Sequence, residues 1–314
     1  MSVSAATAVS ARRVGLPSQR WLGLAPGWWF VLPALAVIGV FFLLPAVATL
    51  ALSVTDFDIY ALADLRNMRF VGFDNFRRIL AGEQADLFWQ ALANTCYFVL
   101  IGGPLSVAVS LGFALLLESK LTRMKGLLRV IFFAPVVTTL VAVSITWRYL
   151  YDRDNGLINN ALETLGLTRI DWLGDPRWAM PSIILLAVWK NFGYNMVIFL
   201  AGLQSIPGEL YEAAALDGAS PWRRFWHVTL PALGPTFLFV GVTTMIGYFQ
   251  LFAEPYVMTR GGPENSTYSL VLLMYEEGFR WWRLGAASAV AVVLFVITLA
   301  AAMAQIAVQR RAAA

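Results

Sequence analysis

The chain has 314 residues, of which 59% are hydrophobic and only 13% are charged. A soluble domain carries about 25% charged residues, so the composition excludes an ordinary water-exposed protein of this length. The single cysteine, Cys96, excludes an internal disulfide and a thiolate metal cluster, and the single histidine, His227, gives little basis for histidine-based catalysis. The net charge of +4 is modest, and bases spread along the loops do not indicate a nucleic-acid site.

Apolar runs long enough to cross a membrane recur along the whole chain, since a spanning helix needs about 20 such residues. We expect an all-α polytopic membrane protein with six spans, at 27–52, 89–117, 126–150, 179–203, 233–254 and 282–308. The first run exceeds the ~7–15 apolar residues of a signal peptide, which favours a retained helix. The expected organisation is a tail at 1–26, the first span at 27–52, a loop at 53–88, a five-helix core at 89–308 and a tail at 309–314.

The basic residues predict the orientation of these spans. Short cytoplasmic segments of membrane proteins are enriched in Lys and Arg. The segments 118–129 and 310–311 are short and basic, which favours the cytoplasmic side for both. Both termini are then cytoplasmic, the 53–88 loop is extracytoplasmic, and the chain is a multi-pass membrane protein.

The segment 204–232 has two sets of helix signals. For the first helix, Ser205 can act as an N-terminal cap, Pro207 suits the first turn, and Glu209 complements the positive end of the helix dipole. Gly218 occupies the position where a helix usually ends in a residue with positive φ. We therefore expect a short helix followed by a tight turn on the cytoplasmic face.

A second helix is expected to begin at Ser220-Pro221 and to be limited by Pro231. The consecutive alanines 213–215 give the first helix a shallow surface that another protein can approach closely. Charged neighbours that could fix the orientation of such a contact are Glu212, Arg223 and Arg224. From the residues alone, a docking element and an amphipathic connector with its arginines facing lipid phosphates both remain open.

The same segment resembles the signature loop of binding-protein-dependent ABC importer permeases. That signature reads Glu-Ala-Ala, three residues, Gly, nine residues, an aliphatic residue, one residue and Leu-Pro. This chain supplies Glu212, Ala213, Ala214, Gly218, Val228, Leu230 and Pro231 at those spacings. The resemblance implies the type I ABC importer permease fold and a 204–232 loop that couples to the ATPase subunit by inserting into a cleft on it.

Further segments resemble the carbohydrate branch of these importers, of the maltose and glycerol-phosphate type. They are 198–212, 71–76 and 256–263, the last followed by Ser266-Thr267. The 256–263 segment is more similar to the first of the two permease subunits than to the second. The likeness spans about 70 to 308, and the tail 1–26 matches nothing usable.

The chain lacks the P-loop pattern Gly-x4-Gly-Lys-Ser/Thr, so it is not expected to hydrolyse ATP itself. The resemblance implies a separate ABC ATPase dimer that carries ATP and Mg, and no cofactor or metal on this chain. It also implies a second homologous permease, an extracytoplasmic sugar-binding protein, contact with membrane lipid, and alternating access to a central cavity for the carbohydrate.

Polar residues within the fourth expected span are Lys190, Asn191, Tyr194 and Asn195. An ionisable residue inside a bilayer is costly, so it should face a cavity or a partner. Two interpretations remain open: this face borders the substrate pathway, or it forms a hydrogen-bonding cluster with the second permease.

The fifth expected span has a polar and aromatic strip, whose members are Thr243, Thr244, Tyr248, Phe249, Gln250 and Glu254. Rings beside hydroxyl and amide groups suit sugar binding, although packing between subunits remains an open alternative. Residues two apart on a helix do not share a face, so Tyr248 and Gln250 are not expected to act together.

The alternative function is an ion-coupled secondary transporter. Such a protein needs acidic residues within the membrane as ion sites. Only Glu254 is a candidate, and it lies at the end of a span.

Overall fold

The computed structural model describes residues 27–119 and 122–313. These residues are helical apart from connecting turns and an isolated bridge between Thr55 and Phe70. The chain divides into two units, Met1–Ala48 and Thr49–Ala314, which are described separately. The expected cytoplasmic tail at 1–26 lies outside the described residues.

The first unit, as far as it is described, is one apolar helix that continues into the second unit. It comprises α1 (Gly27–Ile38), a π-helical turn (Gly39–Leu43) and the beginning of α2 (Leu44–Leu52). From Trp28 to Leu52 it is long and apolar enough to cross a membrane. Its large hydrophobic side chains are exposed, as a lipid-facing helix requires.

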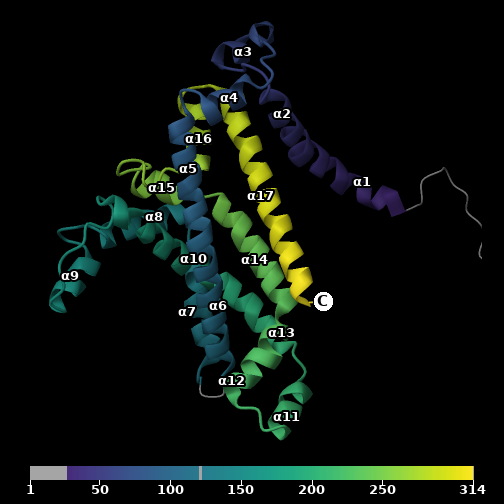
Figure 1. Ribbon diagram of the computed structural model, residues 1–314, viewed down its shortest axis with the longest axis vertical. Coiled ribbons are helices and arrows are strands. Elements are labelled where there is room, and N and C mark those ends of the chain that lie inside the picture. The colour runs from purple at the N-terminus through teal and green to yellow at the C-terminus, as the bar shows by residue number, and fades with distance from the viewer. Residues whose placement is uncertain (1–26, 120–121, 314) are drawn as a thin grey trace, which may run out of the picture. The chain divides into compact units, whose positions relative to one another are not determined.

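The second unit is a helical bundle with a short helical segment at each end (Figure 1). Its further helices are α3 (Ile59–Ala63), α4 (Asp74–Ala81), α5 (Ala85–Tyr97), α6 (Gly103–Glu118), α7 (Lys125–Val137), α8 (Leu140–Leu150), α9 (Leu157–Thr164), α10 (Pro176–Gln204), α11 (Gly208–Leu216), α12 (Pro221–Arg224), α13 (Leu230–Ala232), α14 (Gly234–Phe249), α15 (Ala253–Met258), α16 (Leu270–Tyr275) and α17 (Leu284–Ala313). A 3-10 turn lies at Leu65–Asn67, and π-helical turns lie at Phe98–Gly102, Phe225–Thr229 and Glu276–Arg280.

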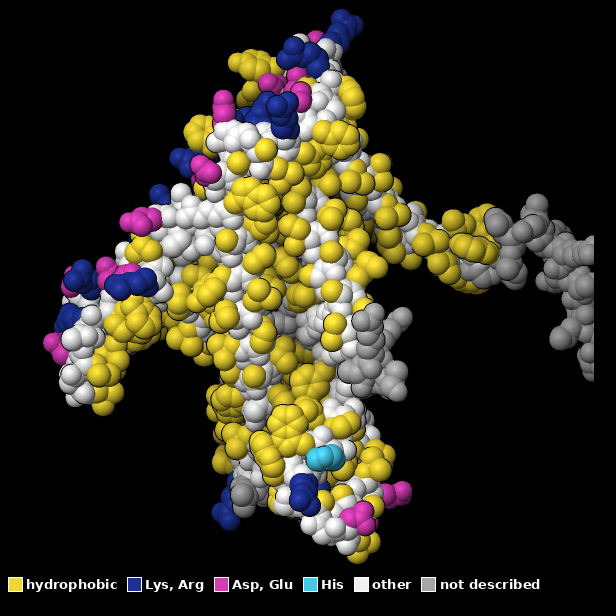
Figure 2. Space-filling view, in the orientation of Figure 1, with side chains coloured by type: hydrophobic (Ala, Val, Ile, Leu, Met, Phe, Trp, Pro, Cys, Tyr) yellow, Lys and Arg dark blue, Asp and Glu magenta, His cyan; other side chains and the backbone are white. Residues whose placement is uncertain are grey.

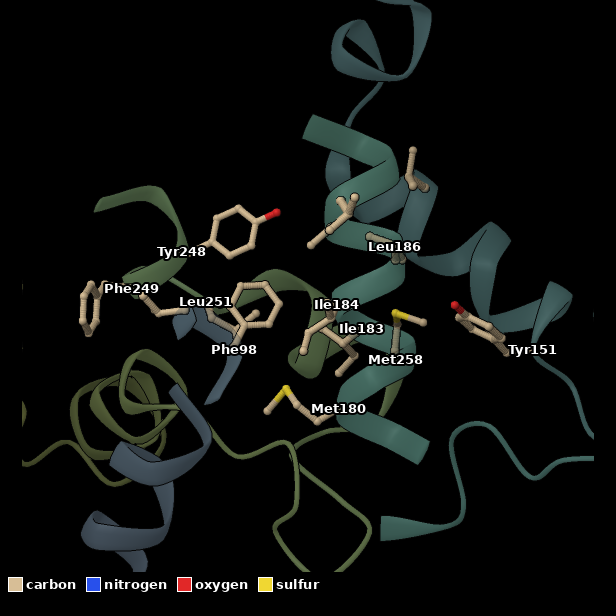
Figure 3. Close-up of a cluster of buried hydrophobic side chains, with 14 residues drawn as sticks. Phe98, Tyr151, Met180, Ile183, Ile184, Leu186, Tyr248, Phe249, Leu251 and Met258 are labelled. Atoms are coloured by element: carbon tan, nitrogen blue, oxygen red, sulfur yellow. The ribbon is translucent and has the colours of Figure 1, made fainter. Parts of the chain in front are cut away.

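Helix α10 is the centre of this bundle. It packs against α6, α7 and α14, and α14 packs in turn against α17. Several of its apolar side chains, among them Ile183, Ile184 and Leu186, are almost fully buried and join Phe98 and Tyr248 in one cluster (Figure 3). Because α10 is covered by neighbours on several sides, the polar residues on it must bond to protein groups or face a cavity.

The described residues contain five unbroken candidate spans, at Trp28–Leu52, Ala85–Glu118, Pro176–Gln204, Gly234–Met258 and Leu284–Gln309. They correspond to five of the six expected runs, and the all-α prediction is confirmed. On the face shown in Figure 2, hydrophobic side chains cover the helices between the α3–α4 end and the α11–α12 end of the second unit. Charged side chains gather at those two ends and around α9, as expected when the middle of the bundle lies in lipid.

The third expected run, 126–150, is not one straight helix. It consists of α7 and α8, which are bent by 98° at a break after Val137. Pro135 lacks a backbone N–H, and the backbone of Thr138 and Thr139 is extended, so the ladder of helical hydrogen bonds stops there. The break was not predicted, because the hydropathy of an apolar run does not change where a helix ends within it.

The close contact of α7 with α10 depends on Gly193. A Cβ atom at this position would collide with the backbone carbonyl of Phe132 and lie 3.1 Å from the Cα of Phe133. We expect Gly193→Ala to destabilise the protein by ~1–3 kcal/mol, because overpacking forces the two backbones apart. A thermal melt of the purified complex would measure this loss. Gly112→Ala, where a Cβ meets nothing within 4 Å, is the matched control and should leave the melting temperature unchanged.

Candidate functional site

The predicted loop 204–232 folds as a helical hairpin at one end of the bundle (Figure 1). Helix α11 begins at Gly208, with Glu209 in its first turn, and ends at Leu216. Gly218 follows with a φ of +75°, and its N–H donates to Ala215 O at 3.1 Å. Ser220 then caps α12, since its Oγ accepts from Arg223 N at 3.4 Å. The predicted glycine turn and the second helix start are confirmed.

Three details of this hairpin differ from expectation. Ser205 does not cap α11: it ends α10, and its Oγ donates to Gly202 O at 2.7 Å. Pro207 precedes α11 instead of lying in its first turn. Pro231 does not stop the second helix before it, because α12 continues through a π-helical turn into α13, which contains Pro231. The wider π-helical turn accommodates the missing proline N–H, with Leu230 N donating to Phe225 O.

The tip of the hairpin is exposed. Leu216 is 89% exposed and Trp222 is 68% exposed, which is costly for apolar side chains in water. Glu212, Ala213, Gly218, Arg223 and Pro231 are exposed as well, whereas Ala214, Arg224 and Leu230 are half-buried. The surface has the small residues and charges that the sequence predicted, together with apolar side chains suited to a protein contact.

A hydrogen bond ties the two arms of the hairpin together. The hydroxyls of Tyr211, on α11, and Thr229, in the π-helical turn, lie 3.0 Å apart. Thr229 is buried, so its hydroxyl has little access to water as an alternative partner. The contact therefore links α11 to the helical segment that follows Ser220.

Removing this bond should loosen the hairpin without unfolding the bundle. We expect Tyr211→Phe to cost about 1 kcal/mol locally, because the Thr229 hydroxyl then loses a partner. Amide hydrogen exchange in α11 should accelerate about fivefold, and exchange in α10 should not change. Tyr60→Phe, at an exposed tyrosine whose hydroxyl has no bond in the structure, is the control.

A cavity of about 470 Å³ lies between α10, α14, α15 and the α7–α8 break. Its lining residues are Phe98, Val136, Leu140, Ala187, Asn191, Tyr194, Asn195, Thr243, Thr244, Gly247, Tyr248, Gln250, Leu251, Phe252, Ala253 and Glu254. The cavity therefore brings together polar residues from the fourth and fifth expected spans that lie far apart in the sequence.

Tyr248 is a closely packed aromatic residue of this cavity. Its ring stacks on Phe98 at 4.8 Å between centroids, and a Cβ atom at Gly102 would lie 2.8 Å from the ring. The side chain is only 4% exposed, and its buried hydroxyl lies beside Ser106 and Asn191 without a well-formed hydrogen bond to either. Figure 3 shows this hydroxyl directed toward α10. A buried hydroxyl with no well-formed bond can gain a partner when a small shift of the ring brings it to a ligand.

The side-chain amides of Asn191 and Asn195, on α10, are held in place by hydrogen bonds to other protein groups. Asn195 Nδ2 donates to Thr244 Oγ1 at 2.9 Å, and Asn191 Nδ2 donates to Ala187 O at 3.0 Å. The carbonyl oxygens of both amides stay free of protein donors in the structure's hydrogen bonds. The asparagines therefore present acceptors at fixed positions.

Lys190 does not line the cavity but lies behind the residues that do. Its Nζ donates to Val136 O at 3.0 Å, and the residue is buried. Val136 O is free to accept because the α7–α8 break removes the helical donor that would otherwise reach it. Lys190 thus caps the end of α7 within this chain.

Gln250 lines the same cavity as Tyr248, contrary to the expectation from helical periodicity. Helix α14 ends at Phe249, and Gln250 has a φ of −90° and a ψ of 25°, so the 3.6-residue spacing no longer applies. Phe98, Val136 and Leu140 also line the cavity and were missed, because only packing brings their helices to it.

Charged residues at the opposite end of the bundle make structural contacts. Glu277 is buried and accepts from Gln84 at 2.9 Å and from Arg283 at 2.8 Å. Burial raises the pKa of Glu277, and Arg283 and Gln84 oppose that effect. Glu276 has a different partner, since its carboxylate accepts from the Tyr268 hydroxyl at 2.6 Å, so the two adjacent acids do not act as a pair.

The family of this chain follows from its similarity to known proteins. Residues 20–313 match the family described as the inner membrane component of binding-protein-dependent transport systems. The chain belongs to this family. The permease is 40% identical over 281 residues to the lactose transport system permease protein LacF of Rhizobium radiobacter, covering 88% of this chain and 90% of that one. It is 34% identical over 273 residues to the trehalose/maltose permease protein MalF of Thermococcus litoralis, covering 87% and 90%.

The fold of the permease is similar to that of a bacterial alginate ABC transporter solved with a periplasmic protein bound to alginate pentasaccharide. The TM-score is 0.75 at 23% identity, and the match covers 91% of this chain and 94% of that one. The predicted type I importer permease fold is confirmed, and the permease is a multi-pass inner-membrane transport subunit and not an enzyme.

Proposed function

We propose that this permease carries a carbohydrate through the 470 Å³ cavity, as the first of two membrane subunits of an ATP-driven importer. The observation that carries the proposal is the composition of the cavity wall. Tyr194 and Tyr248 offer rings, while Asn191, Asn195 and Thr244 offer amide and hydroxyl groups. Rings pack on the apolar faces of sugars, and polar groups bond the hydroxyls. Relatives named for lactose and for trehalose and maltose support this class of substrate.

Gln250 is a further member of the proposed substrate pathway. Lys190 does not line the pathway and supports the structure behind it. Because Lys190 Nζ is bonded to Val136 O, we assign it to holding the α7–α8 break in place beside the cavity. Two interpretations were open for the polar face of α10, a substrate pathway and a cluster with the second permease. The substrate pathway is favoured, because Lys190 already has a partner within the chain. Asn191, Tyr194 and Asn195 then remain available to the sugar.

The hairpin 204–232 is the proposed coupling element for a separate ABC ATPase dimer, which holds ATP and Mg. Its exposed Leu216 and Trp222 supply apolar contact area, and Arg223 supplies charge. The Tyr211–Thr229 bond lets the hairpin transmit movement of the ATPase as one body. ATP shifts the importer between two states because it binds one of them better.

The proposed orientation places the hairpin in the cytoplasm. Helix α17 ends on the hairpin's side of the bundle, so the C-terminal tail 309–314 is cytoplasmic (Figure 1). The opposite end, formed by α3, α4 and α16, is then extracytoplasmic together with most of the 53–88 loop. An extracytoplasmic sugar-binding protein docks there, and a homologous permease completes the pathway.

The proposal is tested with the complete complex in proteoliposomes. Sugar and its binding protein together should stimulate ATP hydrolysis and drive sugar uptake. The ion-coupled alternative predicts something different, namely uptake that follows a proton or sodium gradient without ATP. Glu254 does lie in the cavity, as that alternative requires, so the gradient experiment is the one that separates the two functions.

A further inference from the structure

The cavity has one charged side chain among its described lining residues, the carboxylate of Glu254. Glu254 lies in the first turn of α15 and is only 7% exposed. Among the described residues, the donor recorded for its side chain is its own backbone N–H. A buried carboxylate with so few donors needs another source of compensation, from a nearby positive charge or from a ligand.

Lys190 is the positive charge that compensates Glu254. The two side chains interact electrostatically, and both are buried. However, the Lys190 ammonium lies behind the cavity wall and donates to Val136 O at 3.0 Å. It offsets part of the cost of burying the Glu254 charge, which stays negative toward the cavity, and it presents no cation to the cavity interior.

The remaining polar groups of the lining are uncharged. They are the Tyr248 hydroxyl, which has no well-formed hydrogen bond, the amides of Asn191, Asn195 and Gln250, and the hydroxyls of Tyr194, Thr243 and Thr244. An uncharged sugar can bond to all of these groups, and its hydroxyls can donate to the Glu254 carboxylate. An acidic sugar would bring a second carboxylate toward Glu254 and find no free cation from this chain, which is unfavourable at low dielectric.

We propose that Glu254 makes this cavity selective for uncharged carbohydrates and rejects acidic ones of the same size. Rejection by a like charge is an efficient way to discriminate between ligands that share all other contacts. This inference rests on the proposed carbohydrate function and names the substrate class of the same cavity.

The test measures binding to the complex of both permeases and the ATPase in lipid nanodiscs. The binding protein is left out, because its own selectivity would mask that of the cavity. The probes are neutral di- and oligosaccharides, each paired with the aldonic acid obtained by oxidising its reducing end. Equilibrium binding of each labelled pair is compared for wild type, Glu254→Gln, Glu254→Asp and Glu83→Gln. The last is the matched control, because Glu83 is exposed and does not line the cavity.

We expect wild type, Glu254→Asp and Glu83→Gln to bind the neutral sugar about tenfold or more tightly than its acid. Glu254→Gln should narrow this gap to about threefold or less by improving binding of the acid. The inference is overturned if wild type binds both members of a pair equally, or if Glu254→Gln leaves the gap unchanged. Binding of acidic sugars alone would also overturn it while the carbohydrate function stands. If the complex binds neither class, the carbohydrate function itself fails.

Discussion

Replacing Gly218 with proline is expected to separate this permease from its ATPase. The native φ of +75° cannot be reached by proline, whose ring fixes φ near −65°, and the bond from Gly218 N to Ala215 O is lost as well. Strain of ~1–3 kcal/mol at the turn would misplace α12 relative to α11. Docking affinity should fall about tenfold or more, and sugar-stimulated ATP hydrolysis in proteoliposomes should disappear.

Gly166 offers a matched control for this experiment. It follows α9 as Gly218 follows α11, it has a φ of +74°, and its N–H donates to Glu163 O at 2.9 Å. Gly166→Pro therefore introduces the same two defects far from the hairpin along the chain. The ATPase should still co-purify with this variant. Equal loss of the ATPase from both variants would mean that strain anywhere, and not the hairpin, controls assembly.

Truncating Tyr248 is expected to have the second large effect, on sugar uptake. Tyr248→Ala removes both the hydroxyl and the ring of this lining residue, including the stack on Phe98. Uptake should fall more than tenfold, since a buried ring and one sugar hydrogen bond together are worth about 2 kcal/mol or more. Initial rates of labelled sugar uptake measure this loss.

Tyr248→Phe separates the two contributions. The hydroxyl has no well-formed hydrogen bond in the structure, so its removal should leave the melting temperature of the complex unchanged or slightly higher. Uptake should nevertheless fall about threefold to tenfold, because one bond to the sugar is lost. Full uptake by both variants, with the complex assembled, would remove Tyr248 from the pathway and restrict it to packing.

Much of this architecture can be predicted from local patterns. Apolar runs mark the spans, because the bilayer requires about 20 such residues in each. The turn at Gly218 and the helix start at Ser220 follow from capping chemistry that acts over a few residues. These features depend on neighbours in the sequence, which is why they could be predicted without a structure.

The cavity depends on contacts that the sequence does not display. The α7–α8 break arises within a run of uniform hydropathy, and it frees Val136 O for Lys190 on another helix. Gln250 reaches the cavity only because α14 ends one residue earlier. Nothing in the sequence distinguishes Phe98 and Leu140 from other apolar residues, and only packing places them in the same cavity as Tyr248. Periodicity therefore identifies candidate faces, while helix ends and packing decide which of them meet.

Cross-linking from the tip of the hairpin would test its docking role most directly. Cys96 is the single cysteine, so Cys96→Ala provides a background for Leu216→Cys, at a position that is 89% exposed, carrying a photoactivated cross-linker. Phe73→Cys is the control, because Phe73 is 79% exposed and directly precedes α4, which lies at the opposite end of the bundle (Figure 1). We predict an adduct with the ATPase from position 216 and none from position 73. An ATPase that co-purifies but forms no adduct from 216, or forms one from 73, would contradict docking through this hairpin.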